Sequence, residues 1–222
     1  ALMAVVFTDS FTVAVDTNID AYPAGSPDYA YINGSGANIT VNAANDRAQL
    51  PNNGGSTYCA RIIDAAVPTG DQEITGTCYS NTSGNSGGVA VRCATGSNDN
   101  YISYIDYPQT NEVRLLRIDA GSEVLVASAD RGTSGNSAHT HRLKATGTGA
   151  TVSLELQIDA TAVLTYADTA ANRKTSGTPG LCGYNAVGDT IYVDNLSVDD
   201  LIAGGGGSLV YASPALRHLL VR

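Results

Sequence analysis

Apolar and polar residues alternate along most of the chain, in short segments separated by Gly, Asn, Asp or Pro. Alternation of this kind places successive side chains on opposite faces of a β-strand. Clear examples are "ANITVNA", "GGVAVRCA", "EVRLLRID", "ATVSLELQID" and "DTIYVDNLSVDD". About fifteen such segments follow one another, and the pattern therefore predicts an essentially all-β chain.

Helices are not indicated anywhere. No stretch of a dozen residues carries the apolar stripe of period 3.6 that marks an amphipathic helix, and "LRIDAGSEVLVASADR" is interrupted by "DAGS" in the manner of a hairpin turn. Because a single sheet would leave one apolar face in water, so many short strands predict a two-sheet antiparallel β-sandwich. The 222 residues fit one such domain with appendages.

The order of the segments predicts how the strands pair. From "DQEITGTCYS" to "SEVLVASA" they follow one another through short turns, which is typical of an antiparallel meander. The segments within "HTHRLKATGTGATVSLELQIDATAVLTYADT" predict a hairpin pair, and "TIYVDNLSV" is expected to return beside an early strand. We predict the sandwich at residues 1–202, a Gly-rich linker at 203–208 and a C-terminal arm at 209–222.

The net charge and hydropathy of the chain argue against two classes of partner, nucleic acids and membranes. The chain has 21 acidic and 12 basic residues and a formal net charge of -9, which opposes a phosphate backbone, so we expect no nucleic-acid partner. No run of 18 apolar residues is present, so we expect no membrane insertion. The first residues lack the basic and long apolar regions of a signal peptide, which favours synthesis in a cytoplasm without export. A signal removed before residue 1 is the alternative.

The four cysteines are Cys59, Cys78, Cys93 and Cys182. They are too far apart for CxxC metal pairs, and their apolar neighbours suit small buried side chains, so we expect free thiols. The even count leaves disulfides open, with three alternative pairings that the sequence does not rank.

One set of segments, spread over about residues 4–201, carries a resemblance to known proteins: "FTDSF", "NDRAQL", "GGVAVRC", "HRLKATGTGATVSLELQIDATAVLTYAD", "SGTPGLCGYN" and "IYVDNLSVDDL". Together these segments resemble the concanavalin A-like lectin and glucanase jelly-roll superfamily. It implies a concanavalin A-like jelly roll in which one sheet face often binds glycans. The same fold serves lectins, glycosidases, carbohydrate-binding modules and viral structural proteins, so the function has to be argued from the site.

A candidate glycan site lies in "NYISYIDYP". Sugars commonly stack on an aromatic ring, and because the chain has no Trp, tyrosine would serve that purpose. Alternation places Tyr101 and Tyr107 on one face of the strand, and Tyr104 with Asp106 on the other. We predict Tyr104 and Asp106 as glycan-binding residues, provided that their face is exposed. The alternative is that these tyrosines fill a half-buried β-surface.

No convincing catalytic set is present. Glycosidases of the superfamily carry paired Glu residues on one strand face, whereas the nearest pair here is Glu155 and Asp159. Four strand residues separate them by about 13 Å, which exceeds the spacing of either glycosidase mechanism. We therefore expect no enzyme activity.

Metal ligands are equally sparse. His139 and His141 point to one side of a predicted strand, but no third ligand is evident. The spacing of the four aspartates near the end, Asp189, Asp194, Asp199 and Asp200, matches no calcium-loop motif. We expect no metal or other cofactor.

The C-terminal segment "GGGGSLVYASPALRHLLVR" differs from the rest of the chain. Residues 203–222 hold two arginines and no acid, a charge of +2, which leaves 10 basic and 21 acidic residues, or -11, in residues 1–202. Four glycines form a flexible tether, and the apolar remainder requires a partner surface: its own sandwich, a neighbouring copy or another protein. The segment would dock as an added strand or a short helix after Pro214. The predicted contact residues are Leu209, Val210, Tyr211, Leu216, Arg217, Leu219, Leu220, Val221 and Arg222.

A jelly roll with a hinge, an apolar arm and no catalytic set resembles bacteriophage virion components of the capsid decoration or head-fibre type. That resemblance implies a structural protein made in the host cytoplasm and located in the virion. It would be anchored by its arm to other virion or capsid proteins and to copies of itself, and it would adhere to glycans. The alternative is an extracellular carbohydrate-binding module or lectin. A third hypothesis is that the chain is a glycoside hydrolase, which would need two carboxylates about 5 to 10 Å apart in a cleft.

Overall fold

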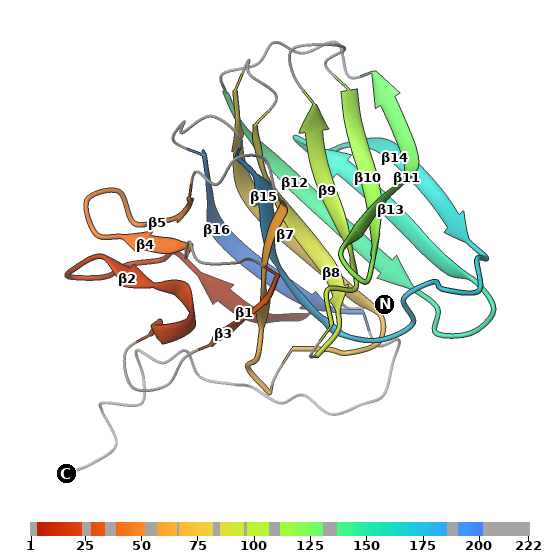
Figure 1. The fold of residues 1–222 in the computed structure, drawn as a ribbon, viewed down its shortest axis with the longest axis horizontal. Coiled ribbons are helices and arrows are strands. Elements are labelled where there is room, and N and C mark those ends of the chain that lie inside the picture. The colour runs from red at the N-terminus through yellow and green to blue at the C-terminus, as the bar shows by residue number, and fades with distance from the viewer. Residues whose placement is uncertain are drawn as a thin grey trace.

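The computed structural model describes residues 4–23, 28–33, 39–51, 57–65, 67–81, 85–95, 97–106, 112–130, 137–185 and 191–201. Within these ranges the chain forms sixteen β-strands and one short 3-10 turn, η1 (Ile19–Ala21). Every strand except the two-residue β2 (Thr17–Asn18) coincides with a segment predicted from the alternation. The prediction of an all-β antiparallel fold is confirmed (Figure 1).

The first layer is built around β7 and β16, which lie side by side. Its strand order is β14 (Thr161–Asp168), β13 (Val152–Ile158), β12 (Ser137–Thr146), β7 (Gln72–Ser80) and β16 (Ile191–Asp200). The far edge of β16 pairs with both β1 (Ala4–Asp9) and β5 (Arg47–Leu50), and β5 continues to β4 (Thr40–Asn42) and β2. The last strand therefore does return beside early ones, as predicted.

The second layer is centred on β8 and β15. Its order is β11 (Ser122–Asp130), β10 (Glu112–Asp119), β9 (Asn100–Asp106), β8 (Ser86–Cys93), β15 (Thr178–Tyr184), β6 (Thr57–Ile62) and β3 (Tyr29–Asn33). β7 pairs with β8 at Ser80 and Ser86, where the chain passes from one layer to the other. The run from β7 to β11 is the predicted meander.

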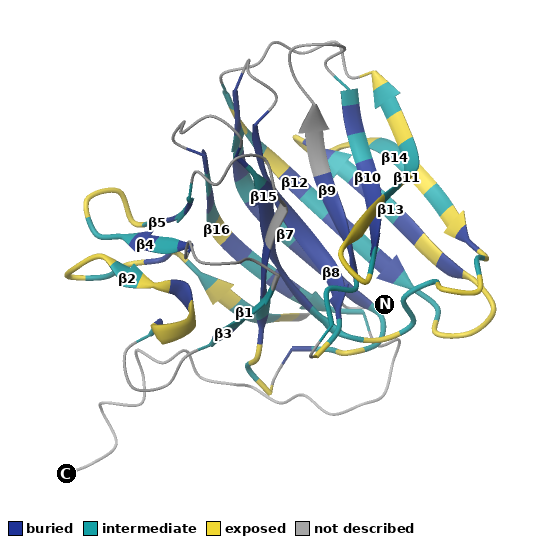
Figure 2. Cartoon of the chain, in the orientation of Figure 1, coloured by how far each residue is buried: buried dark blue, intermediate teal, exposed yellow. Residues whose placement is uncertain are grey.

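The main core lies between the two layers. Alternate residues of facing strands meet there, including Ile74 of β7, Val89 of β8, Leu143 of β12 and Val198 of β16, all fully buried. Buried residues fill β7, β8, β15 and much of β16, whereas β11 and β14 carry many exposed ones (Figure 2). Side chains of period two therefore supply the inner faces of both sheets, which is what a sandwich requires.

A second apolar cluster lies on the other side of the second layer. We call it the outer cluster, and its members are Cys59, Ala90, Cys93, Ile102, Leu116, Ile118 and Cys182, each at most 7% exposed. Its members alternate with inward residues: Ala90 stands between Val89 and Val91, and Cys182 follows Leu181. Both faces of the second layer are therefore apolar near its centre.

Glycine is required where β8 runs beside β9. A Cβ on Gly88 would lie far inside van der Waals contact with the backbone oxygen of Ser103, and 3.1 Å from Sγ of Cys182. Because only glycine lacks that atom, it alone permits this approach. The absence of a side chain at Gly88 also leaves room for the outer cluster beside it.

Several predicted features fall on residues that are not described. The linker and arm, residues 203–222, lie outside the described ranges, as do Tyr107 and Asp189. The backbone of β9 is described to Asp106, but the side chains of Tyr104 and Asp106 are not. In the ranges that are described, no helix has the length and apolar character needed to cross a membrane.

Candidate functional site

The predicted glycan residues lie on β9 beside a charged pair on β10. In the antiparallel register Tyr104 is the partner of Arg114, and Asp106 is the partner of Glu112. The same two β10 residues pair on their other side with Ser128 and Asp130 of β11, both exposed. Since cross-strand partners share a sheet face, these six positions form one surface, which we call the β9–β11 face.

Glu112 and Arg114 form an ion pair within this face. Nε of Arg114 donates a hydrogen bond of 2.8 Å to Oε2 of Glu112, and the side chains are 33% and 19% exposed for Arg114 and Glu112. The charge-assisted hydrogen bond holds both side chains in place, while part of each remains accessible to water. A carboxylate acceptor and a guanidinium donor side by side suit the adjacent hydroxyls of a sugar.

An apolar patch adjoins the charged pair. Leu125 of β11 is 52% exposed and is the register partner of Leu116, a member of the outer cluster. The other exposed residues of β11 are Ser, Glu and Asp. The β9–β11 face therefore combines polar groups with aliphatic surface, as glycan sites do.

Tyr101 serves the structure and lies away from this face. It is fully buried. Its hydroxyl donates a hydrogen bond to Oδ2 of Asp168 at 2.6 Å and accepts one from the backbone N–H of Lys174 at 3.0 Å. The alternative reading, that tyrosines of "NYISYIDYP" fill the β-surface, therefore holds for Tyr101. Burial and the bond to Asp168 raise the pKa of its hydroxyl.

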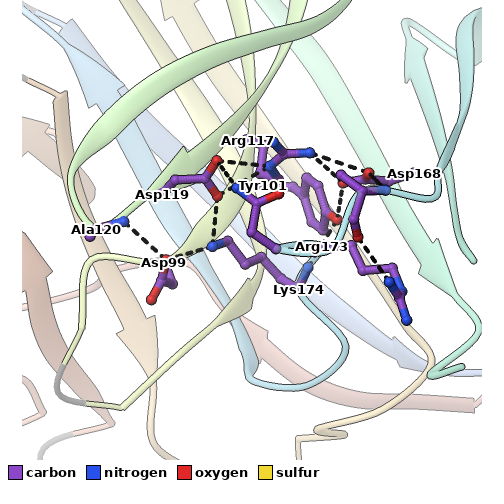
Figure 3. A network of polar contacts seen from close by, with 10 residues as sticks. Asp99, Tyr101, Arg117, Asp119, Ala120, Asp168, Arg173 and Lys174 are labelled. Atoms are coloured by element: carbon purple, nitrogen blue, oxygen red, sulfur yellow. Dashed lines mark hydrogen bonds and ion pairs between the residues drawn. The ribbon is translucent and has the colours of Figure 1, made fainter. Parts of the chain in front are cut away.

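Tyr101 belongs to a polar network at one end of the second layer (Figure 3). Nη1 of Arg117 donates to both carboxylate oxygens of Asp168, at 3.2 and 3.0 Å, and Nε donates to Asp119 at 3.1 and 3.0 Å. Lys174 contributes a second cation, 2.8 Å from Oδ1 of Asp119 and 2.5 Å from Oδ1 of Asp99. Through Lys174 the network connects the segment after β14 to the ends of β9 and β10.

Two carboxylates of the network, Asp168 and Asp99, have pKa values below their usual range. Burial alone would raise the pKa of Asp168, but hydrogen bonds from Tyr101, the backbone of Ala170 and Arg117 outweigh it, and the pKa lies below its usual range. The pKa of Asp99 is lowered to about 2, because bonds from Lys174, Ala120 and Ser97 outweigh its burial. With its acids and bases saturated by one another, this network is a structural element.

Glu155 and Asp159, the nearest carboxylate pair in the sequence, contact different partners. Asp159 lies in the turn between β13 and β14 with φ of 49°, and its Oδ1 accepts from the backbone of Thr140 at 2.9 Å. Its Oδ2 lies 2.9 Å from Nδ1 of His139. Glu155 lies within β13 and accepts from Gln157 at 2.7 Å. Asp159 therefore stabilises a turn.

The two histidines are engaged with serines. Nδ1 of His141 lies 3.0 Å from Oγ of Ser103, and both residues are buried between the layers. Nε2 of His139 lies 2.7 Å from Oγ of Ser137. Among the described residues no group of three His, Cys, Asp or Glu is placed to hold a metal. The Ser103 and His141 pair bridges the two layers, away from any surface a substrate could reach.

A shallow hollow lies on the outer face of the first layer. Its volume is about 320 Å³, and Lys144, Glu155, Thr165 and Tyr166 are among the residues that line it. Lys144 and Glu155 are register partners on β12 and β13. Because this hollow and the β9–β11 face lie on different layers, substitutions can distinguish a ligand bound at one from a ligand bound at the other.

Sequence reasoning missed Glu112 and Arg114. The two residues are two apart in "NEVRLLRID", so alternation alone places them on one face of a strand. Their position beside Asp106 and Tyr104 depends on the register of the β9–β10 hairpin. The sequence predicts the two strands, but only their register shows that Glu112 and Arg114 lie beside Asp106 and Tyr104.

Comparison of the fold with solved structures gives many similar sandwiches. Carbohydrate-binding module CBM66 from Bacillus subtilis has a TM-score of 0.55 at 12% identity, covering 78% of this chain and 96% of that one. An endo-1,3-beta-glucanase from Streptomyces sioyaensis has a TM-score of 0.55 at 11% identity, covering 89% and 96%. The CBM2 module of the evolved Dit of Lactobacillus casei BL23 phage J-1 has a TM-score of 0.50 at 10% identity, covering 89% and 95%.

No protein-family model and no curated protein sequence matches the chain. At 10 to 12% identity the structural likeness shows the fold alone. That fold is a jelly-roll sandwich of the galectin and concanavalin kind, which the carbohydrate-binding modules among these structures share. Its function here depends on the chain's own surface.

Proposed function

We propose that this chain is a non-catalytic glycan-binding jelly-roll domain that holds its ligand on the β9–β11 face. The observation that carries the proposal is the half-buried pair of Glu112 and Arg114, placed by the register directly beside Tyr104 and Asp106. The exposed side chain of Leu125 supplies apolar surface on the same side of the layer. Two carbohydrate-binding modules among the similar structures support the class of ligand.

The chemistry of the pair suits a sugar better than a charged ligand. Glu112 and Arg114 neutralise one another, so a neutral molecule meets a donor and an acceptor without removing a lone charge from water. A ring hydroxyl can donate to the carboxylate while its neighbour accepts from the guanidinium. Aliphatic surface at Leu125 then covers the apolar C–H face of the ring.

Display on a virion is the setting we propose for this activity. The support is the Gly-rich linker at 203–208 and the apolar, basic arm at 209–222, attached to a body of charge -11. A phage protein carries a module of the same fold. In this setting the arm anchors the domain to capsid proteins or to further copies, and the β9–β11 face points outward. An extracellular carbohydrate-binding module or lectin is the alternative setting for the same face.

Substitution of Arg114 by alanine tests the site. We expect Arg114→Ala to weaken binding to the best ligand of a glycan array by about tenfold or more, because a charge-assisted hydrogen bond contributes about 1.5–3 kcal/mol. Tyr104→Ala should abolish binding. The matched control is Lys144→Ala on the first layer, which should bind within about twofold of the parent. Loss of binding in Lys144→Ala alone would move the site to the other layer, and a parent that binds no glycan would end the proposal.

Deletion of residues 204–222 tests the anchoring arm. We expect the shortened chain to remain a folded monomer with the thermal midpoint of the parent, because the sandwich buries its own core. It should no longer join the oligomer or particle that the full chain forms. Light scattering and electron microscopy of both chains measure this, and assembly that survives the deletion would refute the anchoring role.

A further inference from the structure

Three of the four cysteines gather in the outer cluster. Cys59 of β6, Cys93 of β8 and Cys182 of β15 are each at most 1% exposed and belong to the same apolar group. Cys78 lies apart on β7, in the main core, where its thiol is 3.7 Å from the backbone oxygen of Gly76. The second layer therefore holds more than one thiol within one buried patch.

The strand register selects one pair among them. Cys59 and Cys182 are direct partners in the antiparallel pairing of β6 with β15. Directly opposed residues have Cα atoms about 4.5 to 5.5 Å apart, which lies inside the span of about 4.4 to 6.8 Å that a disulfide bridges. The Cα separation expected for directly opposed residues therefore permits a disulfide between them.

Cys93 is excluded as a partner of Cys182 by the same register. It pairs with Thr178, which lies four residues before Cys182 on β15. Four residues of strand correspond to about 13 Å, well beyond the reach of a disulfide. Cys78 belongs to the first layer, so it faces the main core from the opposite sheet.

We propose that Cys59 and Cys182 form a disulfide when the chain folds in the presence of a small-molecule disulfide such as oxidised glutathione. The thiolate of one cysteine displaces one glutathione and forms a mixed disulfide. The thiolate of the other attacks the protein sulfur of that bond and releases the second glutathione. Two protein thiols become one disulfide, and one oxidised glutathione becomes two reduced ones.

Burial determines when this bond can form. Both thiols are fully buried in the folded domain, so an oxidant reaches them only before the outer cluster closes. Desolvation also raises the pKa of the Cys182 thiol, which lowers the fraction of reactive thiolate in the folded state. The reaction therefore belongs to folding, and the folded reduced protein should be oxidised only slowly.

Refolding of the full chain with mixed reduced and oxidised glutathione tests the proposal. After unfolding in guanidinium, refolding and alkylation of free thiols with N-ethylmaleimide, peptide mapping should find Cys59 linked to Cys182 and alkyl groups on Cys78 and Cys93. The bond closes a long loop, so the thermal midpoint should rise by on the order of 10 °C and fall back on reduction.

Cysteine variants provide the matched controls. Cys93→Ala should keep both the bond and the rise in the midpoint, whereas Cys182→Ala should lose both. Should Cys182→Ala fail to fold, the peptide map of the parent still decides the pairing. A bond between any other two cysteines, or four alkylated thiols in a correctly refolded protein, would overturn the proposal.

Discussion

Replacing Asp168 by alanine is expected to lower the free energy of unfolding by about 3 kcal/mol. Asp168 is fully buried and accepts hydrogen bonds from Arg117 and from the hydroxyl of Tyr101. Its removal leaves a buried guanidinium with one carboxylate partner fewer. Arg117 keeps Asp119, which places the loss at the lower end of the usual range of about 3–5 kcal/mol. Urea denaturation followed by circular dichroism measures the change.

Acid should reduce this difference. The pKa of Asp168 is lower in the folded chain than its ordinary value, so its stabilisation is fully present above about pH 4 and is lost as the pH falls through the folded pKa. The difference in stability between the parent and Asp168→Ala should therefore shrink progressively as the pH falls below about 4. The matched control is Asp20→Ala, an exposed residue of η1, with an expected change within about 0.5 kcal/mol. Equal stability of Asp168→Ala and the parent at pH 7 would show that the network contributes nothing.

Gly88→Ala is expected to destabilise the domain by about 3 kcal/mol, through the addition of one methyl group. The new Cβ would collide with the backbone oxygen of Ser103 on β9 and approach Sγ of Cys182. A backbone atom of a neighbouring strand can give way only if the two strands separate, so the pairing of β8 with β9 must loosen. The urea midpoint should fall accordingly, with the amide exchange of β8 and β9 increased.

The chain contains its own control for this substitution. A Cβ on Gly149, in the segment between β12 and β13, would meet no atom within 4 Å. Gly149→Ala should therefore be neutral or stabilise the chain by a few tenths of a kcal/mol, since alanine restricts the unfolded state. If both variants lose stability equally, the close approach of Ser103 is not the reason that position 88 requires glycine.

The candidate site shows how far one strand can be interpreted on its own. Alternation in "NYISYIDYP" separates the face of Tyr101 from that of Tyr104, and the burial of Tyr101 agrees with it. The pattern did not decide whether Tyr101 contacts a ligand or packs within the fold, and its burial shows that it packs within the fold. Glu112 and Arg114 joined the site only through the hairpin that sets them opposite Asp106 and Tyr104.

Alternation and turn residues in the sequence predict the strands and the sandwich class, because both are local properties of the chain. The sequence also predicts that the last strand returns beside an early one, and the pairing of β16 with β1 confirms this. The identity of the other partner strands, and the register of each pair, became evident from the three-dimensional structure. Cys59 meets Cys182, and Arg117 meets Asp168, across long stretches of intervening chain. Such contacts depend on the simultaneous packing of many strands, since a shift of one residue would turn every side chain of a strand to the opposite face.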